Sequence, residues 1–290
     1  MWRQPPRLSD ERSEELCRCT RRYNQIMPSR IAIPMPHSID REYADRAIPQ
    51  YERAIEQAGG EPVRVPLDQP PNEVMKIVET CDGVLLPGSN ADVDPAKFGA
   101  TRSPHTATAD PRRDAVDELL LQDAYQLRKP VLGICYGLQT LNVYRAGSLI
   151  QHIPDFLPED LRTRINHEAG KKIAVAHAVE VEKDSKLAGI LGTTNIVALP
   201  VNSSHHQSAE TIGKGLRLAA RCPDDGIIEA LEGTAPNHFV LAVQWHPERS
   251  VDEDESSRAI FRALIEAAEN RATEARPSSS RSLRFLPCFL

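Results

Sequence analysis

The chain has 290 residues, of which 40% are hydrophobic, so it is long enough to bury a full core. Its 41 acidic and 35 basic residues give a net charge of −6, which provides no general attraction for nucleic acid or an acidic membrane surface. No stretch approaches the roughly 20 apolar residues that cross a bilayer, and the N-terminus lacks the apolar segment of a secretory signal.

Residues 1–27 are charged and contain prolines without clear periodicity. We expect them to be a disordered extension, or a mis-annotated segment upstream of a true start at Met27. Residues 273–290 are rich in serine and arginine and predict a flexible C-terminal tail. One domain is expected over residues 28–272. Six scattered cysteines are too few for a disulfide framework, so we expect a reducing, cytoplasmic location.

Strand-like and helix-like segments alternate along this domain. Apolar runs that predict strands lie at 30–34, 61–66, 83–87 and 130–134. Helical spacing of apolar residues is found at 43–58, 72–79 and 114–128. This alternation favours an α/β fold with three layers, α/β/α, around a doubly wound, mostly parallel sheet. Shorter alternating segments that indicate added antiparallel strands follow at 172–181, 215–219 and 227–231.

Cys135 lies where the apolar run 130–134 meets a segment with helical apolar spacing. In an open parallel sheet this junction is at the carboxyl edge, where ligands bind. A thiol at a helix N-terminus has its thiolate favoured by the free N–H groups. Gly133 and Gly137 flank it, giving G-x-C-x-G, the cysteine counterpart of the G-x-S-x-G nucleophile elbow. The pattern predicts a nucleophile, although a buried core cysteine beside a turn would also fit the pentapeptide.

A second candidate element is the apolar run from Phe239 that ends in His246-Pro247-Glu248. On a strand, residues i and i+2 share a face, so His246 and Glu248 are expected to face one site. A carboxylate beside an imidazole fixes its tautomer and stabilises its charged form. A surface turn would explain the triplet alone, but together with Cys135 it predicts a Cys-His-Glu hydrolase.

These motifs resemble the class I glutamine amidotransferase-type domains, and specifically the free-standing peptidase C26 group that includes gamma-glutamyl-GABA hydrolases. The matching stretches, in the family's order, are 86–95, 113–114, 129–143, 201–207, 225–230 and 243–248. The resemblance implies a flavodoxin-like class I glutamine amidotransferase fold. It also implies Cys135 as nucleophile, His246 as base and acid, and Glu248 as the partner that orients His246.

The resemblance further implies an oxyanion hole made of backbone N–H groups from Gly88 or Ser89 and from Tyr136. Gln139 is implied to contact the glutamyl group, although a solvated helix residue is the alternative. The residues implied to lie near the substrate in the loop after position 201 are Asn202, Ser203, His205 and His206. An adjacent histidine pair is otherwise a weak metal cue, since no cysteine or carboxylate partner stands at suitable spacing, so no metal and no cofactor are expected.

Three positions depart from the family pattern: Tyr136 stands where many relatives carry arginine, Ala146 replaces a glycine and His152 replaces an aspartate. Asp114 and Asp117 match a family aspartate and glutamate. Because Tyr136 follows the nucleophile, we expect it to influence substrate identity.

The implied activity is hydrolysis of the amide bond of a small gamma-glutamyl compound, such as gamma-glutamyl-GABA, through a thioester, with a place in polyamine catabolism. Two alternatives stay open. One is a glutaminase subunit that delivers ammonia to a synthase, and the other is a catalytically idle binding protein of the same fold. No nucleic-acid or membrane partner is expected, and the oligomeric state is open, a homodimer included.

Overall fold

The structure, a computed structural model, describes residues 27–162, 164–193 and 198–275. The expected N-terminal extension lies outside these residues apart from Met27. The expected C-terminal tail also lies outside them, apart from residues 273–275, which belong to the last helix. The strands are β1 (Arg30–Pro34), β2 (Glu61–Val65), β3 (Gly83–Leu86), β4 (Val131–Ile134), β5 (Leu149–Ile150), β6 (His177–Val181), β7 (Ala198–Val201), β8 (Ser208–Ala209), β9 (Leu216–Arg221), β10 (Ile228–Gly233) and β11 (Val240–Val243). The helices are α2 (Arg41–Gln57), α3 (Pro71–Val78), α4 (Pro111–Leu127), α5 (Tyr136–Tyr144), α6 (Ile153–Phe156), α7 (Glu159–Arg162), α8 (Lys186–Ile190) and α9 (Glu255–Ala275). Short 3₁₀ turns are η1 (Pro95–Phe98), η2 (Ala169–Lys171) and η3 (Pro247–Arg249).

The central sheet has the strand order β2-β1-β3-β4-β11-β10-β9-β6-β7. From β2 to β11 neighbouring strands are parallel, and from β11 to β7 they are antiparallel. β3, β4 and β11 are buried along their whole length, as strands covered on both faces should be. The prediction of a mostly parallel sheet with antiparallel additions is therefore confirmed.

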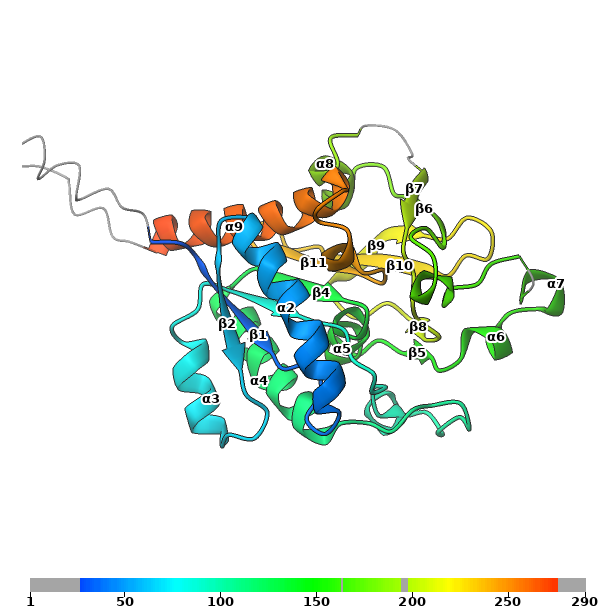
Figure 1. Ribbon diagram of the computed structural model, residues 1–290, viewed down its shortest axis with the longest axis horizontal. Helices are drawn as coiled ribbons and strands as arrows, with labels where there is room; N and C mark the ends of the chain where they lie inside the picture. Colours follow the sequence, from blue (N-terminus) through cyan, green and yellow to red (C-terminus); the bar gives the residue numbers. More distant parts are fainter. Residues whose placement is uncertain (1–26, 163, 194–197, 276–290) are drawn as a thin grey trace, which may run out of the picture.

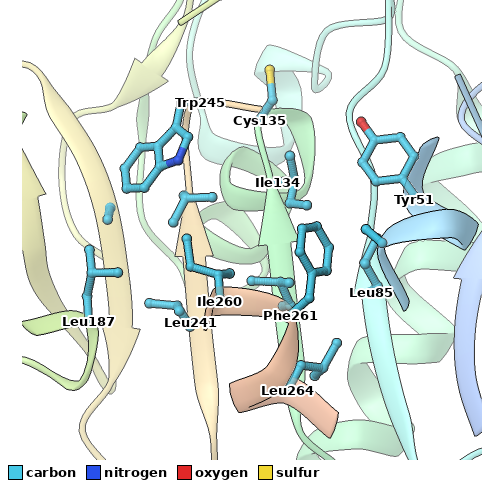
Figure 2. Close-up of a cluster of buried hydrophobic side chains, with 14 of the residues drawn as sticks. Tyr51, Leu85, Ile134, Cys135, Leu187, Leu241, Trp245, Ile260, Phe261 and Leu264 are labelled. Atoms are coloured by element: carbon cyan, nitrogen blue, oxygen red, sulfur yellow. The ribbon is translucent and has the colours of Figure 1, made fainter. Parts of the chain in front are cut away.

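Helices cover both faces of this sheet and make the three layers (Figure 1). α2, α8 and α9 share one hydrophobic cluster with the sheet, and α3, α4 and α5 share the other. Figure 2 shows the first cluster, where Ile260, Phe261 and Leu264 of α9 pack near Ile134 of β4 and Leu241 of β11. No helix in the described ranges is long and apolar enough to cross a membrane.

The strand expected at 172–181 is correct only for its second half. β6 begins at His177 because its partner β7 ends opposite it, at Val201. The preceding residues follow η2, and the N–H of Ile173 donates to Ala169 O within that turn. An alternating sequence pattern does not reveal where the partner strand stops.

Candidate active site

Cys135 lies on a sharp turn between β4 and α5, as its flanking glycines predict. Its backbone has φ 54° and ψ −106°, a left-handed conformation that side chains rarely adopt. A Cβ on Gly133 would lie 2.8 Å from Gly137 O, and a Cβ on Gly137 would overlap Leu86 O. Small neighbours are thus required for this turn. Figure 2 shows the Cys135 sulfur at the end of β4, directed away from the apolar cluster.

His246 and Glu248 meet just beyond the end of β11. His246 Nδ1 and Glu248 Oε1 are 2.7 Å apart, and both side chains are buried. The expectation that they share one face of a strand is wrong, because β11 ends at Val243 and Pro247 opens the turn η3. Proline lacks an N–H, which a strand requires but the first position of a helical turn does not. The turn still brings the two side chains together.

The backbone of His246 is held by the side chain of Asn202, from the segment after β7. His246 N–H donates to Asn202 Oδ1 at 2.9 Å, and Asn202 Nδ2 donates to His246 O at 2.9 Å. The amide of Asn202 is therefore used to position His246 and is not free to bind a ligand.

The electrostatics of this cluster favour a charged His246. Burial lowers its pKa, but the Glu248 carboxylate, with a smaller contribution from Cys135, outweighs burial and raises the pKa to about 9. Burial raises the pKa of Glu248, and the facing His246 outweighs this and holds the pKa below its ordinary value. A charged His246 carries a proton that it can give to a departing amine.

In the described part of the chain, two backbone N–H groups of residues that line the cavity with Cys135 have no protein acceptor. Gly88 N–H already donates to the hydroxyl of Tyr51 on α2 at 3.0 Å, whereas the N–H groups of Ser89 and Tyr136 have no such partner among the described residues. A Cβ on Gly88 would lie 3.0 Å from both His246 Cε1 and Tyr51 Oη. Of the two expected loop donors, the geometry therefore favours Ser89.

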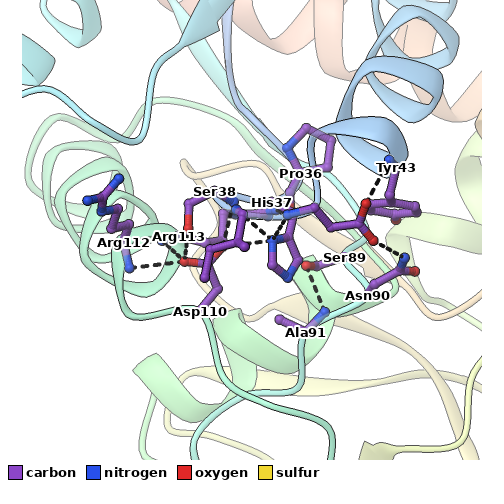
Figure 3. A network of polar contacts seen from close by, with 12 residues as sticks. Pro36, His37, Ser38, Tyr43, Ser89, Asn90, Ala91, Asp110, Arg112 and Arg113 are labelled. Atoms are coloured by element: carbon purple, nitrogen blue, oxygen red, sulfur yellow. Dashed lines mark hydrogen bonds and ion pairs between the residues drawn. The ribbon is translucent and has the colours of Figure 1, made fainter.

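Side-chain caps hold this loop against the starts of two helices (Figure 3). Asp40 caps α2 by accepting the Tyr43 N–H and also accepts from Asn90 Nδ2 at 3.3 Å. Asp110 caps α4 and accepts from both the N–H and the hydroxyl of Ser38. The segments before α2 and α4 and the loop that carries Ser89 are thus tied together at the carboxyl edge of the sheet.

A cavity of about 450 Å³ opens over Cys135 and His246. Its walls include the following residues expected at the site: Ser89, Tyr136, Gln139, His205 and His206. Asn202 and Ser203, expected to contact substrate, are not in the wall; Ser203 is fully buried. No local sequence signal pointed to Tyr43, Arg46 and Arg249, which line the same cavity.

Gln139 and the two loop histidines are already engaged with the protein. Gln139 Nε2 donates weakly to Gln207 O at 3.3 Å and lies in the cavity wall. His206 Nε2 is 3.1 Å from Asp92 Oδ1, whereas the Nε2 of His205 faces Glu229, 3.4 Å away in β10. The adjacent histidines thus have different surroundings.

Tyr136 is buried, and its hydroxyl donates to Asp114 Oδ1 on α4 at 2.5 Å. Asp114 also pairs with Lys97 at 3.3 Å. Neighbouring Asp117 pairs with Arg113 inside the protein at 2.7 Å, a structural contact. The position expected to influence substrate identity therefore has its polar group engaged within the protein.

Comparison with known proteins agrees with this arrangement. The Peptidase C26 family model matches residues 32–248. A Mycobacterium tuberculosis protein provisionally named a glutamine amidotransferase is 39% identical over 226 residues, which cover 77% of this chain and 67% of that protein. The chain belongs to the peptidase C26 family. This chain is also 35% identical to the gamma-glutamyl-gamma-aminobutyrate hydrolase of Escherichia coli K12 over 229 residues, which cover 78% of this chain and 87% of that protein.

Solved structures support the fold described above. The glutaminase domain of Trypanosoma brucei CTPS aligns with a TM-score of 0.53 at 18% identity, covering 83% of this chain and 94% of that chain. A Thermoplasma acidophilum protein, provisionally described as part of a GMP synthase, aligns with a TM-score of 0.57 at 17% identity, covering 85% and 97%. This chain therefore has the class I glutamine amidotransferase fold. The names of its relatives support a hydrolase or amidotransferase-like role.

Proposed function

We propose that this protein is a cysteine hydrolase that cleaves the amide bond of a small gamma-glutamyl compound. The observation that carries the proposal is that a strained, glycine-flanked Cys135 and His246 line one cavity, and that the buried Glu248 lies against His246 on its other side. A nucleophile, a base that lines the same cavity and a carboxylate that orients the base are the parts of a nucleophilic triad.

In the first half-reaction the Cys135 thiolate attacks the gamma-carbonyl carbon of the substrate. A C–S bond forms, and the carbonyl oxygen becomes an oxyanion within reach of the Ser89 and Tyr136 N–H groups. The C–N bond then breaks as the imidazolium of His246 gives its proton to the departing amine. Losing one oxyanion donor typically costs about 2.7–4 kcal/mol of transition-state stabilisation.

In the second half-reaction water attacks the thioester while neutral His246 accepts its proton. The C–S bond breaks, glutamate leaves, and Cys135 and His246 return to the thiolate–imidazolium state. Glu248 stays ionised throughout and holds the ring of His246 in place.

The charges around the cavity support a substrate with carboxylates. Arg46 on α2 and Arg249 in η3 both line it, and the one acidic residue that the described chain contributes to its walls, Asp92, already pairs with His206 at 3.1 Å. A gamma-glutamyl group carries an α-carboxylate, and gamma-glutamyl-GABA adds a second at its far end. Arginine suits carboxylate recognition because its planar fork can donate two parallel hydrogen bonds.

The test is glutamate release by the full-length protein from a panel of gamma-glutamyl amines, with gamma-glutamyl-GABA and glutamine included. We expect the Cys135→Ala variant to lose at least about 10³-fold in kcat/KM. The matched control is Cys81→Ala, because Cys81 is also buried but lies just before β3, and burial raises its pKa. The control should retain activity. Unchanged hydrolysis by the Cys135→Ala enzyme would refute the proposal.

Which substrates are cleaved, and under which conditions, distinguishes the proposed hydrolase from its two alternatives. Release from gamma-glutamyl amines by the isolated protein supports the hydrolase. Glutamine cleavage that appears only when a synthase is added would point to a glutaminase subunit. A folded protein whose Cys135 resists glutamine-like diazo-ketones and that cleaves no substrate would indicate the idle binding protein.

A further inference from the structure

Three histidines and one glutamate meet in the interior of the antiparallel half of the protein. His167 precedes η2, His177 opens β6, His205 lies in the loop after β7, and Glu229 belongs to β10. All four side chains are buried, and one donor atom from each lies within 4.8 Å of the others. Buried ionisable groups need partners that match them in charge and in hydrogen bonding.

The outer nitrogen of each histidine already donates a hydrogen bond. The acceptors are Asp225 Oδ2 for His167 Nε2 at 2.8 Å, Ala178 O for His177 Nδ1 at 3.0 Å and Gln207 O for His205 Nδ1 at 2.8 Å. Carbonyl and carboxylate oxygens only accept, so these nitrogens carry the ring proton. In a ring that carries one proton, that proton is therefore on the outer nitrogen and the inner nitrogen presents a lone pair.

The three inner lone pairs converge on the carboxylate of Glu229, which is also an acceptor. Apart from one another, these inner atoms have no polar partner among the described residues. A proton could satisfy one contact: the pKa of His167, lowered by burial, is raised more strongly by Asp225 and Glu229, to about 9. The inner nitrogens of His177 and His205 each lie 3.4 Å from the same Glu229 oxygen, so one proton cannot satisfy all three contacts.

A metal ion would satisfy all four groups together. Glu229 Oε1 lies 3.0 Å from His167 Nδ1 and 3.4 Å from the Nε2 atoms of His177 and His205. Tetrahedral zinc with bonds of about 2.0–2.1 Å has neighbouring ligand atoms about 3.3 Å apart. Metal-bound histidines usually donate their other N–H to a carboxylate or a backbone carbonyl, as all three do.

We propose that His167 Nδ1, His177 Nε2, His205 Nε2 and the Glu229 carboxylate bind one divalent transition-metal ion of the Zn²⁺ type. Three imidazoles and one carboxylate suit Zn²⁺ and disfavour Mg²⁺ or Ca²⁺, which prefer oxygen ligands. Four protein ligands in a buried site leave no open coordination position, so the ion is structural. It would join β6 and β10 to the loop whose His206 lines the cavity over Cys135.

The first test measures the metal content of full-length protein purified without an affinity tag. We expect about one zinc per chain in the unmodified protein, and less than about a tenth of that in His177→Ala and Glu229→Gln. The matched control is His105→Ala, because His105 belongs to a separate, exposed grouping with His152 and Asp155. The control should keep its zinc, and a variant series that does not change metal content would contradict the assignment.

The second test uses the unmodified protein alone and so does not depend on whether variants fold. Removal of metal with a chelator should lower Tm by about 5–10 °C, and Zn²⁺ should restore it. Added Co²⁺ should give the visible absorption of a tetrahedral site. If the chelated protein keeps its Tm and neither ion changes Tm or absorbance, the cluster holds protons only and the proposal is overturned. Neither test requires hydrolase activity.

Discussion

The protonation state of His246 depends chiefly on the carboxylate of Glu248. Glu248 Oε1 lies 2.7 Å from His246 Nδ1, and both side chains are buried. The Glu248 charge is the main reason that the pKa of His246 rises to about 9 although burial opposes it. Charge in this pair therefore sets the pH range in which His246 can give a proton to a leaving amine.

A Glu248→Gln substitution should lower kcat/KM by about 10²–10⁴-fold, because the ring loses its orienting charge while the shape of the site is kept. In the unmodified enzyme activity should fall as the pH rises through about 9, where His246 loses its proton. Without the carboxylate the pKa of His246 drops, so this alkaline limb should move to lower pH. The measurement is kcat/KM from neutral to alkaline pH with the best gamma-glutamyl amide.

Glu253→Gln serves as the control for this profile, since Glu253 is an exposed carboxylate five positions further along the chain. Its rate and its alkaline limb should match those of the unmodified enzyme. An unshifted limb in Glu248→Gln would mean that a group other than His246 governs the profile.

At the level of elements, the site depends on how closely α5 approaches β3. Gly137 in the first turn of α5 lies against Leu86 at the end of β3, with no room for a methyl group. The same approach brings Cys135 beside the loop that carries Ser89. Packing at this point is therefore both a stability requirement and a requirement of the site.

Gly137→Ala should lower the free energy of unfolding by about 3 kcal/mol, because its Cβ would overlap the rigid backbone oxygen of Leu86. Gly189→Ala is the matched control, since this glycine lies in α8 with open space around its Cβ position. Alanine is the better helix former, so the control should be neutral or stabilised by up to about 1 kcal/mol. Denaturant unfolding of both variants tests this, and equal loss in the two would exclude a specific clash.

At the scale of the whole molecule, local sequence patterns predicted the parallel half of the sheet, from β2 to β11, well. β1 spans the residues that its apolar run predicts, and the turn at Cys135 follows from glycine spacing, because both signals lie within a few adjacent residues. The contact between His246 and Glu248 was also expected, although through a strand in place of a turn.

The rest of the arrangement arises from chain segments that are far apart in the sequence. Tyr51 on α2 accepts the Gly88 N–H, and His177 of β6 faces Glu229 of β10. Such contacts depend on helix placement and strand register, and no local pattern reports either. For this reason the sequence around His205 and His206 showed no carboxylate partner, although His205 faces Glu229 in the fold.

The candidate site is assembled from both halves of the sheet, and Asn202 makes one of the contacts that join them. It comes from the end of antiparallel β7, yet it holds both backbone groups of His246 beyond parallel β11. Asn202→Ala should therefore lower kcat by about 10²-fold with KM nearly unchanged, because a misplaced base affects the reaction more than substrate binding. Asn237→Ala, an exposed turn residue, should change neither constant. If Asn202 instead contacted the substrate, as its sequence position indicated, its loss would raise KM. Steady-state kinetics on the two variants therefore decides whether this residue positions His246 or binds the gamma-glutamyl group.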